Sequence, residues 1–167
     1  MIIGLSIHTF TIIHVIISLV AIASGIVVLV GMLGAHRLPG WTALFLVTTI
    51  LTSVTGFMFP INGFTPAIGT GIVSILVLGV ALIALYVKHL VGSWRWIYVT
   101  AAATALYFNV LVLIVQSFQK VPALHALAPT QSEPPFLIAQ GCALVVFLVV
   151  GFFAASRFRP ATDVLAR

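Results

Sequence analysis

Residues 5–34 read LSIHTFTIIHVIISLVAIASGIVVLVGMLG and contain no Asp, Glu, Lys or Arg. A helix crosses the hydrocarbon core of a bilayer in about 20 apolar residues, so this run is long enough to span it. In lipid the backbone must satisfy its own polar groups, which leaves only helices and closed barrels, and a barrel strand is much shorter than this run. The stretch therefore predicts a transmembrane helix.

The same pattern returns four more times along the chain, at residues 41–59, 67–90, 96–118 and 136–156. Hydrophobic residues make up 62% of the 167 residues and charged residues 5%, whereas a soluble domain carries about 25% charged residues. We predict an all-α, polytopic bundle of five transmembrane helices that forms one domain over residues 1–160. Residues 120–135 form a loop between the last two spans, and residues 161–167 form a tail.

Turn chemistry marks the loop at residues 120–135. Pro122 suits the first turn of a short apolar helix lying at the membrane interface. At the far end of the loop, Ser132 is the expected N-cap of the last helix, and Glu133 favours the positive end of that helix.

The charges predict an orientation. Five spans place six basic residues on one side and only Lys120 on the other, and positive residues favour the cytoplasm. The N-terminus and the loop at 120–135 are then outside, and the C-terminus is cytoplasmic. The six are contacts for lipid headgroups rather than for nucleic acid: Arg37, Lys88, Arg95, Arg157, Arg159 and Arg167. An anionic-ligand site on this side is a further alternative, with these residues: His36, Arg37, Lys88, His89 and Arg95.

His14 is the histidine that lies well inside a span. It shares a helix face with Ser18, Ala21 and Gly25, and such a small, polar face packs against other helices. An ionisable group within a span is a candidate functional residue, and the alternative is a neutral histidine that bonds to a neighbouring helix.

Several amides fall in the same outer half of the bundle. Asn109 and Gln116 share a face of the fourth span, and Gln140 enters from the outer side of the fifth. Because an unpaired amide in hydrocarbon is costly, these side chains should turn inward. With His14 and the loop residue His125, they form a candidate ligand-binding pocket; hydrogen bonds between helices without a ligand are the alternative.

Metal and haem binding are open alternatives. His8, His14, His125 and Glu133 are candidate metal ligands on the outer side, although no fixed metal-ligand spacing joins them. Histidines in a helix bundle also bind haem b, and one haem near the outer face would use His14. No cofactor is assigned by the sequence.

Four segments together resemble a family of small, functionally uncharacterised bacterial integral membrane proteins: WTALFL at 41–46, TSVTGF at 52–57, WRWIYV at 94–99 and VPALHALAPTQSEPPF at 121–136. The resemblance covers most of the chain and implies a bacterial inner-membrane location, without an activity or catalytic residues. His14 on its Ser/Ala/Gly helix, followed by His36-Arg37, is similar more distantly to membrane cytochrome-like bundles.

We expect a non-enzymatic protein, because packing faces are abundant and motifs for catalysis are absent from the sequence. The leading hypothesis is an accessory or scaffolding subunit of a membrane complex, or a homo-oligomer. The alternative is a cytochrome-like, quinone-binding or metal-binding redox protein that uses the outer-half pocket. A small channel or carrier is the third class, which the shortage of intramembrane charge disfavours.

Overall fold

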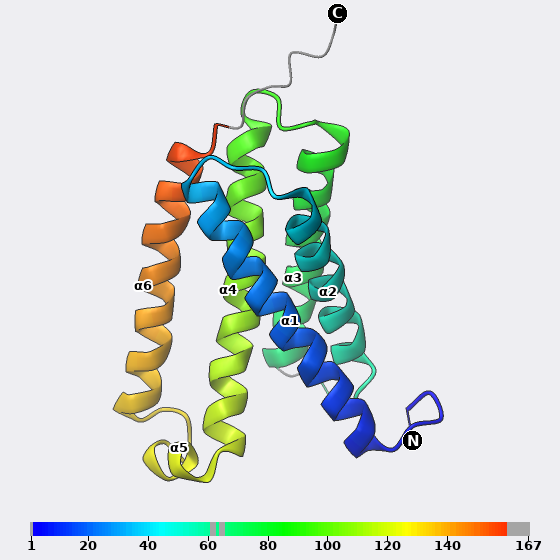
Figure 1. The fold of residues 1–167 in the computed structure, drawn as a ribbon. Helices are drawn as coiled ribbons and strands as arrows, with labels where there is room; N and C mark the ends of the chain where they lie inside the picture. The colour runs from blue at the N-terminus through cyan, green and yellow to red at the C-terminus, as the bar shows by residue number, and fades with distance from the viewer. Residues whose placement is uncertain (1, 61–62, 64–65, 160–167) are drawn as a thin grey trace, which may run out of the picture.

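The computed structural model describes residues 2–60, 63 and 66–159, and these form a helical bundle (Figure 1). In chain order the elements are α1 (Ile7–Leu33), α2 (Pro39–Phe57), α3 (Pro66–Leu82), the π-helix η1 (Ile83–Val87), α4 (Trp94–Lys120), the short α5 (Pro122–Leu127) and α6 (Pro134–Arg157). Five helical segments are long and apolar enough to cross a membrane, as the sequence predicted. Their order also agrees with the five apolar runs, and their ends differ by a few residues.

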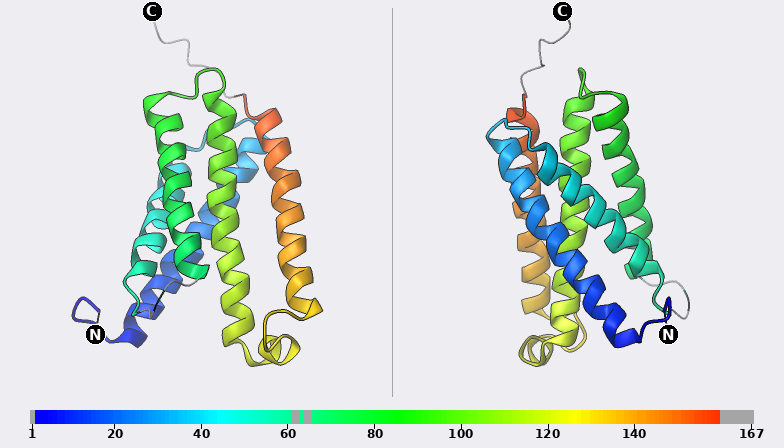
Figure 2. Two further views of the ribbon diagram at one scale, coloured as in Figure 1. Left: turned by 180° about the vertical axis from the view of Figure 1, so that it is seen from behind. Right: turned by 45° about the vertical axis from the view of Figure 1, so that its right-hand side comes forward.

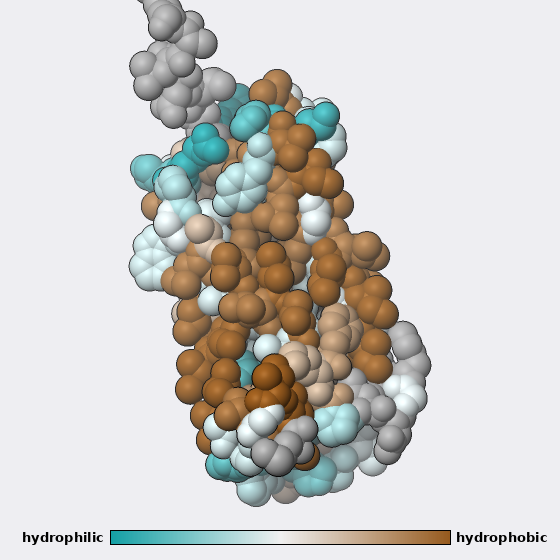
Figure 3. All heavy atoms as spheres, turned by 90° about the vertical axis from the view of Figure 1, so that its right-hand side faces the viewer, coloured by the Kyte–Doolittle hydropathy of each residue, from teal (hydrophilic) through white to brown (hydrophobic). Residues whose placement is uncertain are grey.

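Successive long helices run in opposite directions, so the connections alternate between two ends of the bundle (Figures 1 and 2). The α1–α2 and α3–α4 connections lie at one end with the end of α6, and α5 and the start of α1 lie at the other. On the face seen in Figure 3 the surface between the two ends is broadly apolar, with hydrophilic residues gathered above and below it. Exposed large hydrophobic residues on all five long helices extend this surface into an apolar belt. Exposing so large an apolar surface to water would be unfavourable for a monomer, whereas contact with lipid acyl chains would not be.

Helix α4 is the centre of the bundle and packs against α1, α2, α3 and α6. Four of its buried residues are alanines, Ala101, Ala102, Ala103 and Ala105, and larger side chains are buried beside them. Opposite them, Gly25 of α1 lies so close to its neighbours that an added Cβ would come 2.6 Å from Leu106 Cδ1 and 2.8 Å from the Phe45 ring. Small residues thus set the distance between α1, α2 and α4, as they do in membrane helix pairs.

The start of α6 differs from the sequence-based prediction. Ser132 was expected as the N-cap, but the N-cap is Glu133, and no side chain caps this helix. The Glu133 carboxylate instead accepts hydrogen bonds from the preceding turn, from the backbone N–H and hydroxyl of Thr130 (3.1 and 2.8 Å) and from the N–H of Ser132 (3.1 Å). The short helix predicted from Pro122 is confirmed as α5. The predicted tail at residues 161–167 lies outside the described residues.

Gly25 offers a test of the packing at α4. Gly25→Ala should lower the free energy of unfolding by about 1–3 kcal/mol, because its methyl group would overpack a tight contact. Thermal unfolding in mild detergent would measure the loss. Gly141→Ala in α6 is the matched control, since nothing lies within 4 Å of a Cβ there, and it should be neutral or slightly stabilising. Equal effects of the two substitutions would contradict this account of the packing.

Candidate functional site

His14 is bonded to a neighbouring helix. Its Nδ1 lies 2.7 Å from Oγ1 of Thr55 on α2, and its ring meets Phe59 edge-on at 5.3 Å between centroids. The Thr55 hydroxyl also lies 2.6 Å from the Leu51 carbonyl oxygen. Which partner donates between His14 and Thr55 depends on the imidazole tautomer, and Nε2 takes no part in this hydrogen bond.

The two inward-turned amides also join pairs of helices. Asn109 Nδ2 donates to Thr49 Oγ1 at 3.2 Å, which ties α4 to α2. Gln140 Nε2 donates to the Leu111 carbonyl at 3.3 Å, which ties α6 to α4. Three of the five residues proposed for the outer-half pocket thus make bonds between helices, the alternative that the sequence left open.

The other two residues of that group are exposed. Gln116 points away from the bundle interior, and His125 lies on α5. The views in Figures 1 and 2 agree that α5 lies under α4 and α6, away from the start of α1 that carries His8 and His14. The structure therefore does not bring His125 beside His14.

The candidate metal ligands are likewise dispersed. Among residues 2–60, 63 and 66–159, no three His, Cys, Asp or Glu side chains come together as a metal-binding group. His8 is exposed on α1, and Glu133 is held within its own turn. Desolvation acts to raise the pKa of the Glu133 carboxyl, but hydrogen bonds from Thr130 and Ser132 outweigh it and bring the pKa below its ordinary value.

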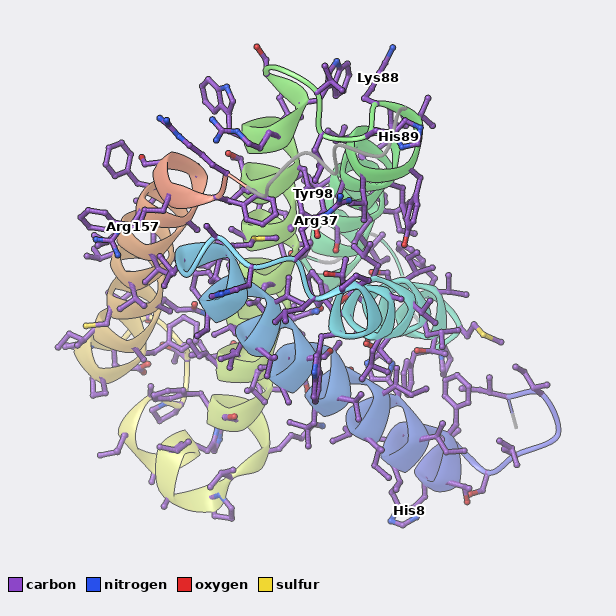
Figure 4. All side chains as sticks on the ribbon, turned by 45° about the horizontal axis from the view of Figure 1, so that its top comes forward. His8, Arg37, Lys88, His89, Tyr98 and Arg157 are labelled. Atoms are coloured by element: carbon purple, nitrogen blue, oxygen red, sulfur yellow. The ribbon has the colours of Figure 1, made fainter. Side chains whose placement is uncertain are left out.

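The opposite end of the bundle carries most of the described basic residues. Arg37 follows α1, Lys88 follows η1 and Arg157 ends α6 (Figure 4). Arg95 lies in the first turn of α4, and Arg159 follows α6. We call this the basic end; Arg167 lies outside the described residues. Several of these cations have partners: Lys88 Nζ lies 5.4 Å from the centroid of the Trp94 ring, Arg157 lies 5.5 Å from that of Phe153, and Arg95 donates to the Phe158 carbonyl at 2.8 Å.

A cavity of about 190 Å³ opens at the basic end, and we call it the basic-end cavity. Its polar lining comes from the α1–α2 connection, α2, η1, the α3–α4 connection and α4: His36, Arg37, Thr42, Tyr86, His89 and Tyr98. Its apolar lining includes Val28 and Met32 of α1, Leu85 of η1, and Leu90 and Phe158. The exposed part of this lining, which we call the rim, is mostly polar, and the buried part, the floor, is mostly apolar but includes Thr42 and Tyr98.

Tyr98 and Arg37 stand next to each other in this lining (Figure 4). Tyr98 is only 2% exposed. Its hydroxyl lies against the side chain of Thr42 and within electrostatic reach of the Arg37 guanidinium. Arg37 itself is exposed at the rim. Phe158, whose ring centroid lies 6.3 Å from that of Tyr98, closes one wall and is held there by Arg95.

Unusual backbone geometry builds both connections that reach the cavity. Helix α1 ends in a Schellman motif, in which the N–H of His36 bonds to the Gly31 carbonyl at 2.9 Å and the N–H of Ala35 to that of Met32 at 3.1 Å. The left-handed position of this motif, usually a glycine, is Ala35 with φ 58°. A left-handed conformation costs a non-glycine residue roughly 1–2 kcal/mol.

The α3–α4 connection repeats this feature. The π-helix η1 ends α3, and His89 and Leu90 follow it with φ 49° and 61°. The N–H of Leu90 closes the turn on the Ala84 carbonyl at 3.0 Å. Both π-helices and strained residues recur at functional sites, so their observation here favours a functional reading of the cavity.

Sequence reasoning noted His36, Arg37 and His89 as residues of one side but did not assign Thr42 or Tyr98 to a site. The available signal was that two basic connections fall on the same side of the bundle. Nothing in the sequence indicates that they face the same cavity, because that depends on how α1, α3 and α4 pack.

Comparison of the chain with protein-family models, with curated proteins and with solved structures gave no match. The family resemblance inferred from the sequence stays a prediction. The functional interpretation accordingly rests on the geometry described above.

The hydrogen bond of His14 can be tested within α2. Thr55→Val should lower the free energy of unfolding by about 0.6 kcal/mol, the average for hydrogen bonds between membrane helices. Thr52→Val is the matched control, because the Thr52 hydroxyl oxygen is buried without a hydrogen-bond partner in the described part of the chain. Removing that hydroxyl should be neutral or stabilising. Unfolding in detergent would measure both, and a greater loss for Thr52→Val would contradict the assignment.

Proposed function

We propose that this protein is a multi-pass membrane protein that binds an amphipathic small molecule in the basic-end cavity. The observation that carries the proposal is the composition of the cavity wall, a polar and basic rim over an apolar floor. Sites for small molecules combine a mostly apolar lining with a few convergent polar groups in the same way. A molecule with a polar head and an apolar body would match both parts.

The position of the cavity supports an amphipathic ligand. It lies where the apolar belt meets the basic end, and the exposed Trp41 and Trp96 lie at this end. Tryptophan is enriched at the level of the lipid headgroups. A cavity at this level is open to molecules that partition into the membrane, whereas a water-soluble ligand would gain nothing from the apolar floor.

We further propose that the basic end faces the cytoplasm of a bacterial inner membrane. The support is the excess of Arg and Lys there, against Lys120 at the end that holds α5. Short loops with such an excess are retained on the cytoplasmic side.

Cysteine labelling tests this orientation. In a Cys142→Ala background, a membrane-impermeant maleimide should label Ala126→Cys of α5 in intact cells. Ser93→Cys, which precedes α4 at the basic end, should react only after the cells are permeabilised. Both native residues are exposed, so access to the reagent decides the result, and the reverse pattern would overturn the orientation.

Two hypotheses from the sequence stay predictions. An accessory or scaffolding subunit would use an outer helix face, and α6 offers one, since Ala154 is its single buried residue among the described positions. Lipid would cover that face as well as a partner would. A redox protein with haem, quinone or a metal in the outer half would use Nε2 of His14.

The cavity can be blocked from within. Leu85 lines it and is half-buried, so Leu85→Trp should fill the floor and weaken ligand binding about tenfold or more, a loss of roughly 1.4 kcal/mol. Native mass spectrometry of the purified protein, titrated with dioctanoylglycerol and with dioctanoyl phosphatidate, would count the bound molecules.

The matched control is Leu76→Trp. Leu76 is 66% exposed on the same helical segment and does not line the cavity, so this variant should bind both lipids as the unmodified protein does. Variants that elute as a single species with unchanged thermal unfolding qualify for the comparison. If Leu85→Trp and Leu76→Trp bound both lipids equally well, the cavity would not be the binding site and the proposed function would fail.

A further inference from the structure

We infer that the basic-end cavity recognises the phosphate group of its ligand and that Arg37 is the residue that binds it; this inference rests on the proposed function. The cavity rim is rich in hydrogen-bond donors. Arg37 presents a planar guanidinium with five N–H groups, and the imidazoles of His36 and His89, which are exposed, add further donors. Arg binds phosphate through paired hydrogen bonds and is the side chain best shaped for that geometry.

No described carboxylate balances this charge. Of the two acidic residues, Asp163 lies outside the described residues, and Glu133 lies at the opposite end of the bundle and bonds within its own turn. A ligand that brings its own negative charge would supply what this end of the described chain lacks.

Of the other described cations at the basic end, three are engaged elsewhere and Arg159 lies outside the cavity lining, which singles out Arg37. Lys88 lies over Trp94, Arg157 lies over Phe153, and Arg95 bonds to the Phe158 carbonyl. Arg37 lines the cavity beside Tyr98, and it is the one arginine in that lining.

Helix α2 adds to the same positive field. It begins at Pro39, which lines the cavity, and its N-cap Leu38 offers no side-chain hydrogen bond. The free N–H groups of a first turn carry the positive end of the helix dipole and bind phosphate in many proteins. By contrast, the carbonyls of Gly31 in α1 and Ala84 in η1 accept backbone hydrogen bonds from His36 and Leu90.

The two left-handed turns explain how the rim is assembled. Ala35 turns the chain so that His36 and Arg37 reach the cavity from the α1–α2 connection, and the His89–Leu90 turn brings His89 from the α3–α4 connection. Segments far apart in the sequence thus place basic groups around one cavity, whose volume is about 190 Å³. That volume suits a head group, with acyl chains continuing over the apolar belt.

The phosphate group could belong to a lipid head group or to free phosphate. The apolar floor of the cavity favours the lipid. Dioctanoyl phosphatidate and dioctanoylglycerol share their chains and differ in the phosphate, so they separate head-group recognition from burial of the chains. Inorganic phosphate, added as a competitor, reports on the second source.

Native mass spectrometry of the full chain in mild detergent would make the comparison on Arg37→Gln and on Arg157→Gln. Arg37→Gln should bind phosphatidate about tenfold more weakly, the loss typical of charge-assisted hydrogen bonds, and should bind dioctanoylglycerol unchanged. Arg157→Gln removes the same charge at the same end, outside the cavity lining, and should leave both unchanged. Arg37→Lys should fall between the unmodified protein and Arg37→Gln, because it keeps the charge without the paired geometry.

The outcomes separate the two proposals. Equal binding of phosphatidate and dioctanoylglycerol by the unmodified protein, or equal losses in Arg37→Gln and Arg157→Gln, would overturn phosphate recognition by Arg37. The proposed function would survive that result if Leu85→Trp still weakened the binding of both lipids. Inorganic phosphate that displaced phosphatidate at equal concentration would overturn the lipid as the source, and failure to displace it would support the lipid.

Discussion

The close approach of α1 to α2 and α4 at Gly25 is the constraint on which the rest of the structure depends. In lipid, helices gain little from burying apolar side chains, because the surrounding acyl chains are equally apolar, so association relies on contact between closely spaced surfaces. Gly25 and the alanines of α4 provide those surfaces, and Phe45 and Leu106 fill the space around Gly25. The positions of α3 and α6 follow, because both pack on α4.

Polar side chains within the bundle form directional hydrogen bonds between the packed helices. His14 and Asn109 each bond to a threonine of α2, and Gln140 bonds to the backbone of α4. Such bonds are individually modest in membranes, since the separated helices also find partners, but they fix the rotation of each helix about its axis. Three of the five residues that sequence reasoning grouped as a site therefore act first as links between helices, and Nε2 of His14 takes no part in its hydrogen bond to Thr55.

The basic-end cavity arises where this packing ends. Helices α1, α2 and α4 meet closely at Gly25 and separate enough towards the basic end to leave a space between Met32, Thr42 and Tyr98. Ala35, His89 and Leu90 adopt left-handed backbone conformations that glycine would hold with less strain. Their strain is stabilised by the surrounding turns, and it lies in the two connections that carry the histidines and the arginine of the rim.

The sequence by itself determined the five apolar helices, their order, the short helix at Pro122 and the collection of basic residues on one side. These features depend on local composition and on the length of each run, because apolar runs partition into lipid and charged residues stay in water. Tertiary structure alone decided that His14 meets Thr55, that His125 lies apart from it, and that Arg37, His89 and Tyr98 share a cavity. Those outcomes depend on the rotation and spacing of helices, which contacts between distant residues set, and no local pattern in one chain encodes them.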